Sequence, residues 1–166
     1  VALNQALRVY LGNEVRIKWP NDIYYKGKKL GGLLIENVLQ GQYLKSSIIG
    51  IGLNVNQQHF PIDLQTQACS INQILQKDVI LIGLLAVICS HIEKQYLKLK
   101  ADQTASLKSD YLERLYRYGE TTSFRHNGRV FEGVILDVNH DGKLLISSGG
   151  AQKAYDFKEV EFLHHQ

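Results

Sequence analysis

Alternating apolar and polar positions predict an antiparallel meander near the start of the chain. A helical pattern opens the sequence over residues 2–11 and stops at Gly12, a residue typical of helix ends. Short runs with a period of two follow, and turn residues separate them. The expected strands cover residues 15–19, 23–25, 30–39 and 43–55. Consecutive strands joined by such short turns favour antiparallel pairing.

Helical periodicity dominates the middle of the chain. We expect Ser70 to cap a short helix over residues 71–76, and Asp78 to cap a long helix over about 79–100. A further helix is expected over about 107–116. Strands followed by amphipathic helices predict an α+β fold, with a mixed or antiparallel sheet and helices packed on it.

The pattern becomes entirely β after Gly119. Hairpin-turn pairs, mostly Asn-Gly or Asp-Gly in type, separate the segments expected to form strands, which are 121–126, 129–138, 143–147 and 151–162. About five short strands in roughly 45 residues is the size of a small SH3-like barrel. We therefore expect one domain over residues 1–117 and a second over residues 118–166.

Composition and charge narrow the classes of function. The chain has 45% hydrophobic and 21% charged residues, which are globular values, and a net charge of +3 spread along its length does not indicate a nucleic-acid partner. The apolar stretch over residues 79–89 is too short to span a membrane. Two cysteines and six scattered histidines offer no zinc spacing, so we expect no metal site, and free thiols fit a reducing cytoplasm.

A cation, an amide and a carboxylate come together at the end of the first strand. Lys18 alternates with apolar neighbours, so it faces away from the core if they pack into it. Pro20 ends the strand, and Asn21 and Asp22 project from the corner that follows. This group could bind a polar, anionic ligand. The alternative is a surface lysine followed by an ordinary Pro-Asn-Asp turn.

Alternate glycines mark the last strand of the meander. Gly50 and Gly52 leave one face of the strand without side chains, so a ligand ring or another segment could approach the backbone. Asn54 falls on the same face and offers both a donor and an acceptor. Val55 stands where a dinucleotide fingerprint would need a glycine. A strand bent by glycines over a helix is the alternative, and Gly31-Gly32 can be interpreted in the same two ways.

Taken together, these segments resemble the biotin–protein ligases. VRIKWPNDIY at residues 15–24 is similar to the family's signature strand, and KKLGGLLIE at 28–36 to the strand that follows. IGIGLNV at 49–55 is similar to the next strand. ACSI at 68–71 is similar to the segment before the long helices, with Cys69 where threonine is more usual. A small SH3-like C-terminal domain also matches the family's layout.

The resemblance implies a class II synthetase-like ligase fold and a two-step reaction. Biotin and MgATP give biotinyl-5′-adenylate and pyrophosphate, and the biotinyl group then passes to a lysine of a biotin carboxyl carrier domain. By resemblance the catalytic group is Lys18, whose ammonium would offset the repulsion between a carboxylate and an α-phosphate. The implied biotin-binding residues are Lys18, Gly32, Gly50 and Gly52, and the implied nucleotide-binding residues are Asn21, Asp22 and Asn54. A homodimer stays open.

Two family features are missing from these 166 residues: an Arg- and Gly-rich loop over biotin and phosphate, and a Ser/Thr segment that grips the ureido ring. Because methionine is also absent and the first helix lacks a cap, we expect the natural protein to begin before residue 1 and this chain alone to be inactive or nearly so. Residues 159–163 contain no arginine, so we expect no ligand contact from the C-terminal domain.

Three alternatives stay open from the sequence. A lipoate–protein ligase would share the fold and the adenylate chemistry. A non-enzymatic module would use the barrel to bind a peptide and the first part as a scaffold. A repressor–ligase would carry an N-terminal DNA-binding domain in addition to the ligase.

Overall fold

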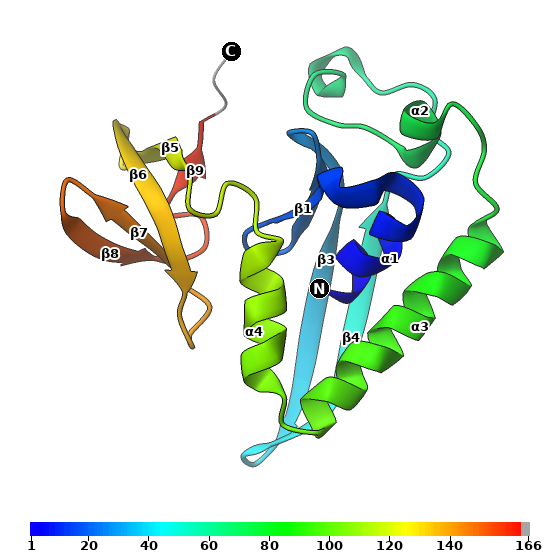
Figure 1. Ribbon diagram of the computed structural model, residues 1–166, viewed down its shortest axis with the longest axis horizontal. Helices are drawn as coiled ribbons and strands as arrows, with labels where there is room; N and C mark the ends of the chain where they lie inside the picture. Colours follow the sequence, from blue (N-terminus) through cyan, green and yellow to red (C-terminus); the bar gives the residue numbers. More distant parts are fainter. Residues whose placement is uncertain (164–166) are drawn as a thin grey trace.

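The first part of the computed structural model, which describes residues 1–163, is a four-stranded antiparallel sheet with helices over one face (Figure 1). The strands are β1 (Val15–Lys18), β2 (Asp22–Tyr25), β3 (Lys28–Gln40) and β4 (Tyr43–Leu53), in the order β1-β2-β3-β4. All three pairings are antiparallel, as the meander pattern predicts. Residues 164–166, the end of the expected second domain, lie outside the described residues.

Four helices belong to this part of the chain: α1 (Ala2–Leu11), α2 (Ile71–Leu75), α3 (Leu81–Lys100) and α4 (Thr104–Glu113). Ser70 caps α2 as expected, because its Oγ accepts the Gln73 N–H at 3.1 Å and the Gln73 side chain accepts the Ser70 N–H at 3.2 Å. None of the described helices is both long and apolar enough to cross a membrane.

Two expectations about the helices were wrong. Asp78 does not cap α3, since Ile80 occupies the N-cap position without a side-chain cap. The Asp78 carboxylate instead accepts a hydrogen bond from Asn72 Nδ2 at 2.8 Å, which ties it to α2. The last helix begins at Thr104, three residues before the expected start. Aspartate in a capping-like context is an ambiguous signal because it also accepts hydrogen bonds from other neighbours.

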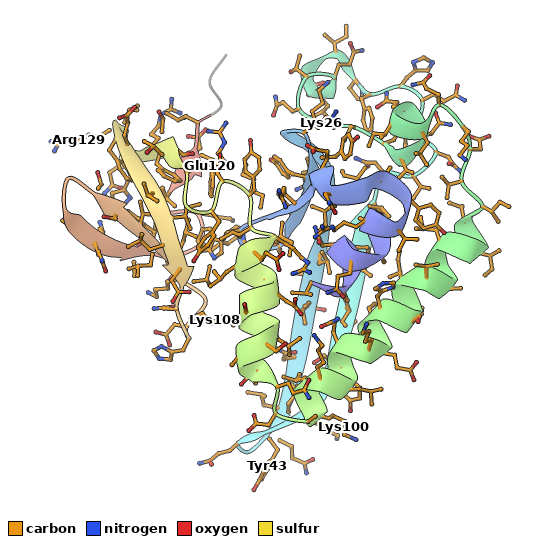
Figure 2. All side chains as sticks on the ribbon, in the orientation of Figure 1. Lys26, Tyr43, Lys100, Lys108, Glu120 and Arg129 are labelled. Atoms are coloured by element: carbon orange, nitrogen blue, oxygen red, sulfur yellow. The ribbon has the colours of Figure 1, made fainter. Side chains whose placement is uncertain are left out.

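The first core lies between the sheet and α1. Apolar residues of α1 face alternate residues of β1 and β2, and α3 closes the far side. Its most buried side chains include those of Leu3, Ala6, Leu7, Val15, Ile17, Ile23, Leu30 and Ile71. Beyond this core the β3–β4 hairpin extends out of the helical cover, and Figure 2 shows Tyr43 at its tip, where the side chain is 81% exposed.

The second part is a five-stranded antiparallel sheet. Its strands are β5 (Thr121–His126), β6 (Arg129–Val138), β7 (Leu144–Ser148), β8 (Ala151–Tyr155) and β9 (Glu161–Phe162), in the order β8-β7-β6-β5-β9. The expected strand over 151–162 is two strands, separated by a turn. Within residues 1–163 no pairing joins β8 to β9, so the sheet is not closed by hydrogen bonds, and the SH3-like barrel stays a prediction.

The end of β1 joins the two parts. Ile17 N–H donates to the Arg114 carbonyl at 2.8 Å, and Tyr116 N–H donates to the Ile17 carbonyl at 2.7 Å. Trp19 packs into the core of the second sheet, not into the first core with Ile17, and its Nε1 donates to the Gly142 carbonyl at 2.9 Å. The signature strand therefore contacts both sheets. The expected domain boundary at residue 118 falls between α4 and β5.

Candidate functional site

The sheet register places four of the predicted site residues in one row. Lys18 pairs with Asp22, Asp22 with Gly32, and Gly32 with Gly52, so the row crosses all four strands. Directly paired residues of an antiparallel sheet point to the same face, and neighbouring strands lie about 4.8 Å apart. Because Ile17 on β1 is buried in the first core, the row lies on the face opposite the helices.

A groove of about 770 Å³ follows this face. Five of the seven predicted residues line it: Asp22, Gly32, Gly50, Gly52 and Asn54. Lys18 and Asn21 do not line it, but each donates a hydrogen bond to a residue that does, Lys18 to Tyr24 and Asn21 to Leu33.

Lys18 lies directly beside the groove, behind Tyr24. Its Nζ donates a hydrogen bond to Tyr24 Oη at 3.0 Å, and Tyr24 lines the groove. Lys18 is partly buried, and burial lowers its pKa below the ordinary value, while the negative charge of Asp22 acts in the opposite direction. Burial also raises the pKa of Tyr24, so the phenol stays protonated at neutral pH.

Asn21 and Asp22 stabilise the corner at the strand end. The Asn21 side-chain Nδ2 donates to the Leu33 carbonyl, and the Asn21 backbone carbonyl accepts the Leu33 N–H at 2.9 Å, so the corner is tied to β3. Asp22 Oδ1 lies 2.7 Å from Lys29 Nζ. This ion pair places a second cation at the groove, because Lys29 also lines it and its side chain is 46% exposed.

The glycines have different structural causes. A Cβ on Gly31 would lie 2.4 Å from the backbone carbonyl oxygen of Gly52, so close packing inside the sheet requires this glycine. A Cβ on Gly32 would lie 2.7 Å from Asp22 Oδ1, the end of a side chain that would have to move aside. A Cβ on Gly50 or Gly52 would meet only ordinary contacts, at 3.6 and 3.9 Å. Packing within the chain therefore does not require Gly50 and Gly52, and side chains there would fill the groove.

Asn54 ends the line of open positions on β4. Its Nδ2 donates to the Cys69 carbonyl at 3.1 Å, and its backbone carbonyl accepts the Ile71 N–H at 3.0 Å. These bonds fix the side chain while its amide oxygen and second N–H keep their capacity to bind a ligand edge.

Sequence reasoning missed the far wall of the groove. The loop between β4 and α2 contributes Phe60, Leu64, Gln67 and Ala68. A polar, irregular segment carries no periodic signal, and only the folded chain shows that it crosses over the glycine face. Tyr24 and Lys29 lie within the two segments that resemble the family's strands. Their place at the groove depends on the pairing of Tyr24 with Lys29 across β2 and β3, which neither segment shows alone.

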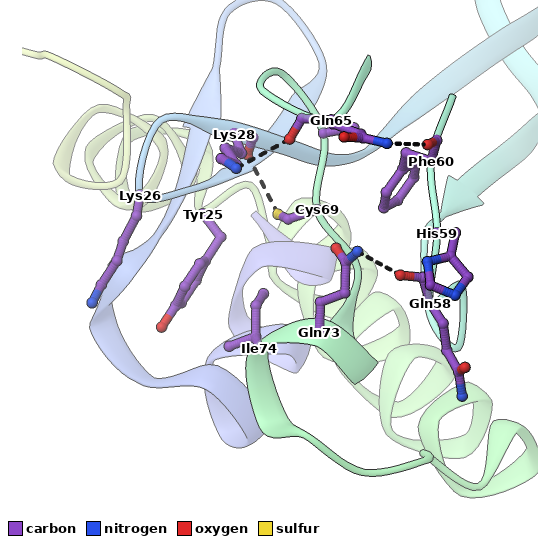
Figure 3. Close-up of a pocket in the computed structure, with 11 residues that line it drawn as sticks. Tyr25, Lys26, Lys28, Gln58, His59, Phe60, Gln65, Cys69, Gln73 and Ile74 are labelled. Carbon is purple, nitrogen blue, oxygen red and sulfur yellow. Dashed lines mark hydrogen bonds between the residues drawn. The ribbon is translucent and has the colours of Figure 1, made fainter. Parts of the chain in front are cut away.

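A second hollow of about 570 Å³ lies on the other side of this loop (Figure 3). Hydrogen bonds within its wall join Lys28 Nζ to the Gln65 carbonyl at 3.2 Å and Gln73 Nε2 to the Gln58 carbonyl at 2.9 Å. Cys69 also lines it, and burial raises the pKa of this thiol to about 11. None of the predicted site residues lines this hollow, so it is separate from the predicted ligand site.

The described residues form no group of three or more His, Cys, Asp or Glu side chains that could hold a metal ion by themselves. The charged residues that line the groove are instead Lys29 and Asp22, and Lys18 lies beside it, behind Tyr24. One cation in the groove, a second beside it and a strand face without side chains accommodate a flat, anionic ligand.

Comparisons with known proteins agree with this arrangement. Residues 1–54 match the Biotin/lipoate A/B protein ligase family. The bifunctional ligase/repressor BirA of Bacillus subtilis is 35% identical over 161 residues, which cover 93% of this chain and 49% of the relative. The solved biotin protein ligase of Aquifex aeolicus, in complex with biotin and ATP, has a TM-score of 0.78 and 25% identity, over 99% of this chain and 68% of that one.

The likeness runs through both sheets, since each of these two alignments covers more than nine-tenths of the chain. The chain spans about half the length of the Bacillus relatives that it matches. The α+β fold and the resemblance expected from the signature strand are both confirmed. By sequence and by fold, this chain is similar to the biotin protein ligases.

Proposed function

We propose that this protein joins biotin to AMP at the expense of ATP and then transfers the biotinyl group to a lysine of a biotin carboxyl carrier domain. In the first step a biotin carboxylate oxygen bonds to the α-phosphorus, and pyrophosphate leaves. In the second step the carrier lysine amine attacks the acyl carbon, and AMP leaves. The solved Aquifex relative, which is described as a complex with biotin and ATP, supports this choice of substrates.

The observation that carries the proposal is the row from Lys18 to Gly52. It places a cation at one end and a surface without side chains at the other, across four strands. We propose that biotin lies along Gly32, Gly50 and Gly52, with its carboxylate toward Lys18. Apolar area along such a groove favours a bicyclic ring, while the polar end sets its direction.

Lys18 acts by charge and position in this proposal. A carboxylate and an α-phosphate repel each other. The repulsion energy of two unit charges about 4 Å apart is roughly 4 kcal/mol at an effective dielectric constant of 20. An ammonium held beside both groups offsets that repulsion and stabilises the charge that develops in the transition state. Lys29 supplies a second positive charge on the same face.

We propose that Asn54, Asp22 and Asn21 form the nucleotide-binding part of the site. We propose that Asn54 hydrogen-bonds the adenine edge and that Asn21 holds the corner from which Asp22 projects. Mg²⁺ usually binds through substrate phosphates and one or two carboxylates. Asp22 is the only carboxylate among the described residues that line the groove, so it fits as the protein ligand for MgATP and would exchange its contact with Lys29.

The carrier domain and the cellular setting are proposals too. The Paracoccus denitrificans relative, named biotin--[acetyl-CoA-carboxylase] ligase, is 24% identical over 98% of this chain and 70% of its own length, which supports a carboxylase carrier as the acceptor. Both cysteines are free thiols in the structure, which supports the cytoplasm. Pairing of two copies of the chain is a further proposal, which sedimentation would test.

Calorimetry tests the substrate. The protein is titrated with a non-hydrolysable biotinyl adenylate and with its lipoyl counterpart. We expect tighter binding of the biotinyl form by at least about tenfold, because the groove suits a bicyclic ring. Tighter binding of the lipoyl form would replace the proposal with a lipoate ligase.

Adenylate formation tests the chemistry. Lys18→Ala should lower the rate by about 10²-fold or more, the usual effect of removing a transition-state charge partner. An unchanged rate would contradict the role of Lys18 and favour a non-enzymatic module.

A further inference from the structure

Side chains from both sheets hold the ammonium group of Lys18. Its Nζ donates a hydrogen bond to Tyr24 Oη at 3.0 Å, lies 4.7 Å from the centroid of the Tyr24 ring, and lies 5.3 Å from the centroid of the Phe162 ring. An ammonium within about 6 Å of an aromatic centroid is attracted to the negative face of the ring. Tyr24 belongs to β2 of the first sheet, and Phe162 belongs to β9 of the second.

The two aromatic rings are themselves fixed by packing. Tyr24 is 7% exposed and packs on Tyr116, with 5.5 Å between ring centroids. Phe162 is also 7% exposed and meets the fully buried Phe124 edge-on at 5.1 Å. Neither ring can move far without disturbing the packing around it. Together they limit where the end of a flexible lysine side chain can lie.

Tyr24 stands between the ammonium group and the groove. It lines the groove, whereas Lys18 does not, and a phenol can accept a hydrogen bond from an ammonium while it donates one to a ligand oxygen. The distance from the charge of Lys18 to any ligand in the groove therefore depends on the position of this hydroxyl. Phe162 supplies the second ring near the ammonium group and comes from a strand about 140 residues later in the chain.

We propose that Tyr24 and Phe162 are positioning residues for Lys18, so that strand β9 of the second sheet completes the ligand site. The proposal rests on the proposed function for what Lys18 does to a substrate. The position of the ammonium group, however, can be measured in the chain without any ligand. The expectation that the C-terminal domain makes no ligand contact stays a prediction, because Phe162 would act on the ligand only through Lys18.

Other ionisable groups that influence Lys18 come from several elements. Asp22, Tyr116 and Glu161 favour its charged form, while Lys29 disfavours it. The Asp22–Lys29 ion pair and Glu161, which is paired with Arg125 at 2.8 Å, remain unchanged in the variants below. Changes in Lys18 can therefore be assigned to the aromatic partners.

The experiment follows Lys18 by NMR in the 166-residue chain labelled with ¹³C at the lysine ε-carbons. Lys18→Arg identifies the signal by removing it. Ring currents shift protons held over a ring face upfield, so Phe162→Leu should cancel much of this shift for Lys18. Tyr24→Phe retains the ring but removes the acceptor, so the pKa of Lys18 should fall further below its ordinary value.

Matched variants control for general effects of the substitutions. Phe157→Leu also removes an aromatic ring from the C-terminal part of the chain. The Phe157 side chain is 55% exposed, and its ring contacts Trp19 edge-on, with 6.4 Å between the ring centroids. Tyr25→Phe removes the hydroxyl from the next residue of β2. Neither control should change the Lys18 signal. If Phe162→Leu does not fold, as judged by circular dichroism, Tyr24→Phe decides the proposal alone.

The outcomes separate this proposal from the proposed function. A Lys18 signal that is the same in the wild type, Phe162→Leu and Tyr24→Phe would overturn the positioning role, whatever the protein binds. Tyr24→Phe should also slow adenylate formation by about tenfold, the value of one hydrogen bond to a charged group, with little change in KM for ATP. A signal that responds as expected in a protein that binds no biotinyl adenylate would retain the positioning role and reject the ligase function.

Discussion

Two neighbouring glycines give the strongest stability test of the site geometry. A Cβ on Gly31 would lie 2.4 Å from the Gly52 carbonyl oxygen and 3.1 Å from Leu53 Cα, whereas a Cβ on Gly52 would lie 3.9 Å from its nearest neighbour. Real Cβ contacts essentially never fall below 3.0 Å. In Gly31→Ala, strands β3 and β4 must therefore separate locally by at least about 0.6 Å, which is a form of overpacking.

The magnitude follows from two opposing effects. Overpacking costs about 1–3 kcal/mol, and the lower entropy of the unfolded alanine chain returns about 0.4–1 kcal/mol. We expect Gly31→Ala to lower the free energy of unfolding by about 1–2 kcal/mol. Gly52→Ala has only the entropic effect and should raise it by about 0.4–1 kcal/mol. Neither glycine has a backbone in the left-handed region, so alanine adds no backbone dihedral strain at either position.

Urea unfolding, followed by circular dichroism, measures both variants. With a slope near 2 kcal/mol per molar, typical of a chain of this size, the midpoint of Gly31→Ala should fall by about 0.5–1 M. Gly52→Ala should nevertheless weaken binding of a biotinyl adenylate, because its methyl group enters the groove. Ser46→Val, on the same face of β4 but outside the groove, is the control for binding. Equal stability of both glycine variants would refute the assignment of their different causes.

Three further predictions concern the rest of the fold. At pH 8 a thiol reagent should quickly modify one thiol per chain, that of the exposed Cys89, because Cys69 is buried and its pKa is raised to about 11. Fast modification of two thiols per chain would contradict this. Trp19→Phe should cost about 1–3 kcal/mol in denaturant unfolding, since the indole hydrogen bond to the β6–β7 turn is lost within a core; an unchanged midpoint would show that this bond contributes nothing. Asp110→Asn should lower the free energy of unfolding at pH 7 by about 1 kcal/mol, because the Lys98 hydrogen bond lowers the pKa of Asp110. A carboxyl whose pKa is lowered by folding stabilises the folded state at pH values above its unfolded pKa. The difference between the variant and the wild type should therefore vanish as the pH of the unfolding measurement falls to about 2–3.

The local chain largely determined the elements and the faces of the first sheet. Alternation in β1 and the turn chemistry after Lys26 specify strands and hairpins without distant contacts, and the observed strands lie within a few residues of the expected ones. Gly50, Gly52 and Asn54 share a face because the side-chain period of a strand is two. The signature segment around Lys18 was sufficient to indicate the family.

Only the tertiary structure decided how these local pieces combine. Register across three hairpins placed Lys18 in a row with Gly52, and cross-strand pairing depends on packing and bulges that no single strand contains. Trp19 alternates with Ile17 as if both shared one core, yet a second sheet more than 100 residues away buries it. The contact of Phe162 with Lys18 has the same origin. Periodicity describes which face a residue occupies, whereas the surface that covers that face depends on contacts far apart in the chain.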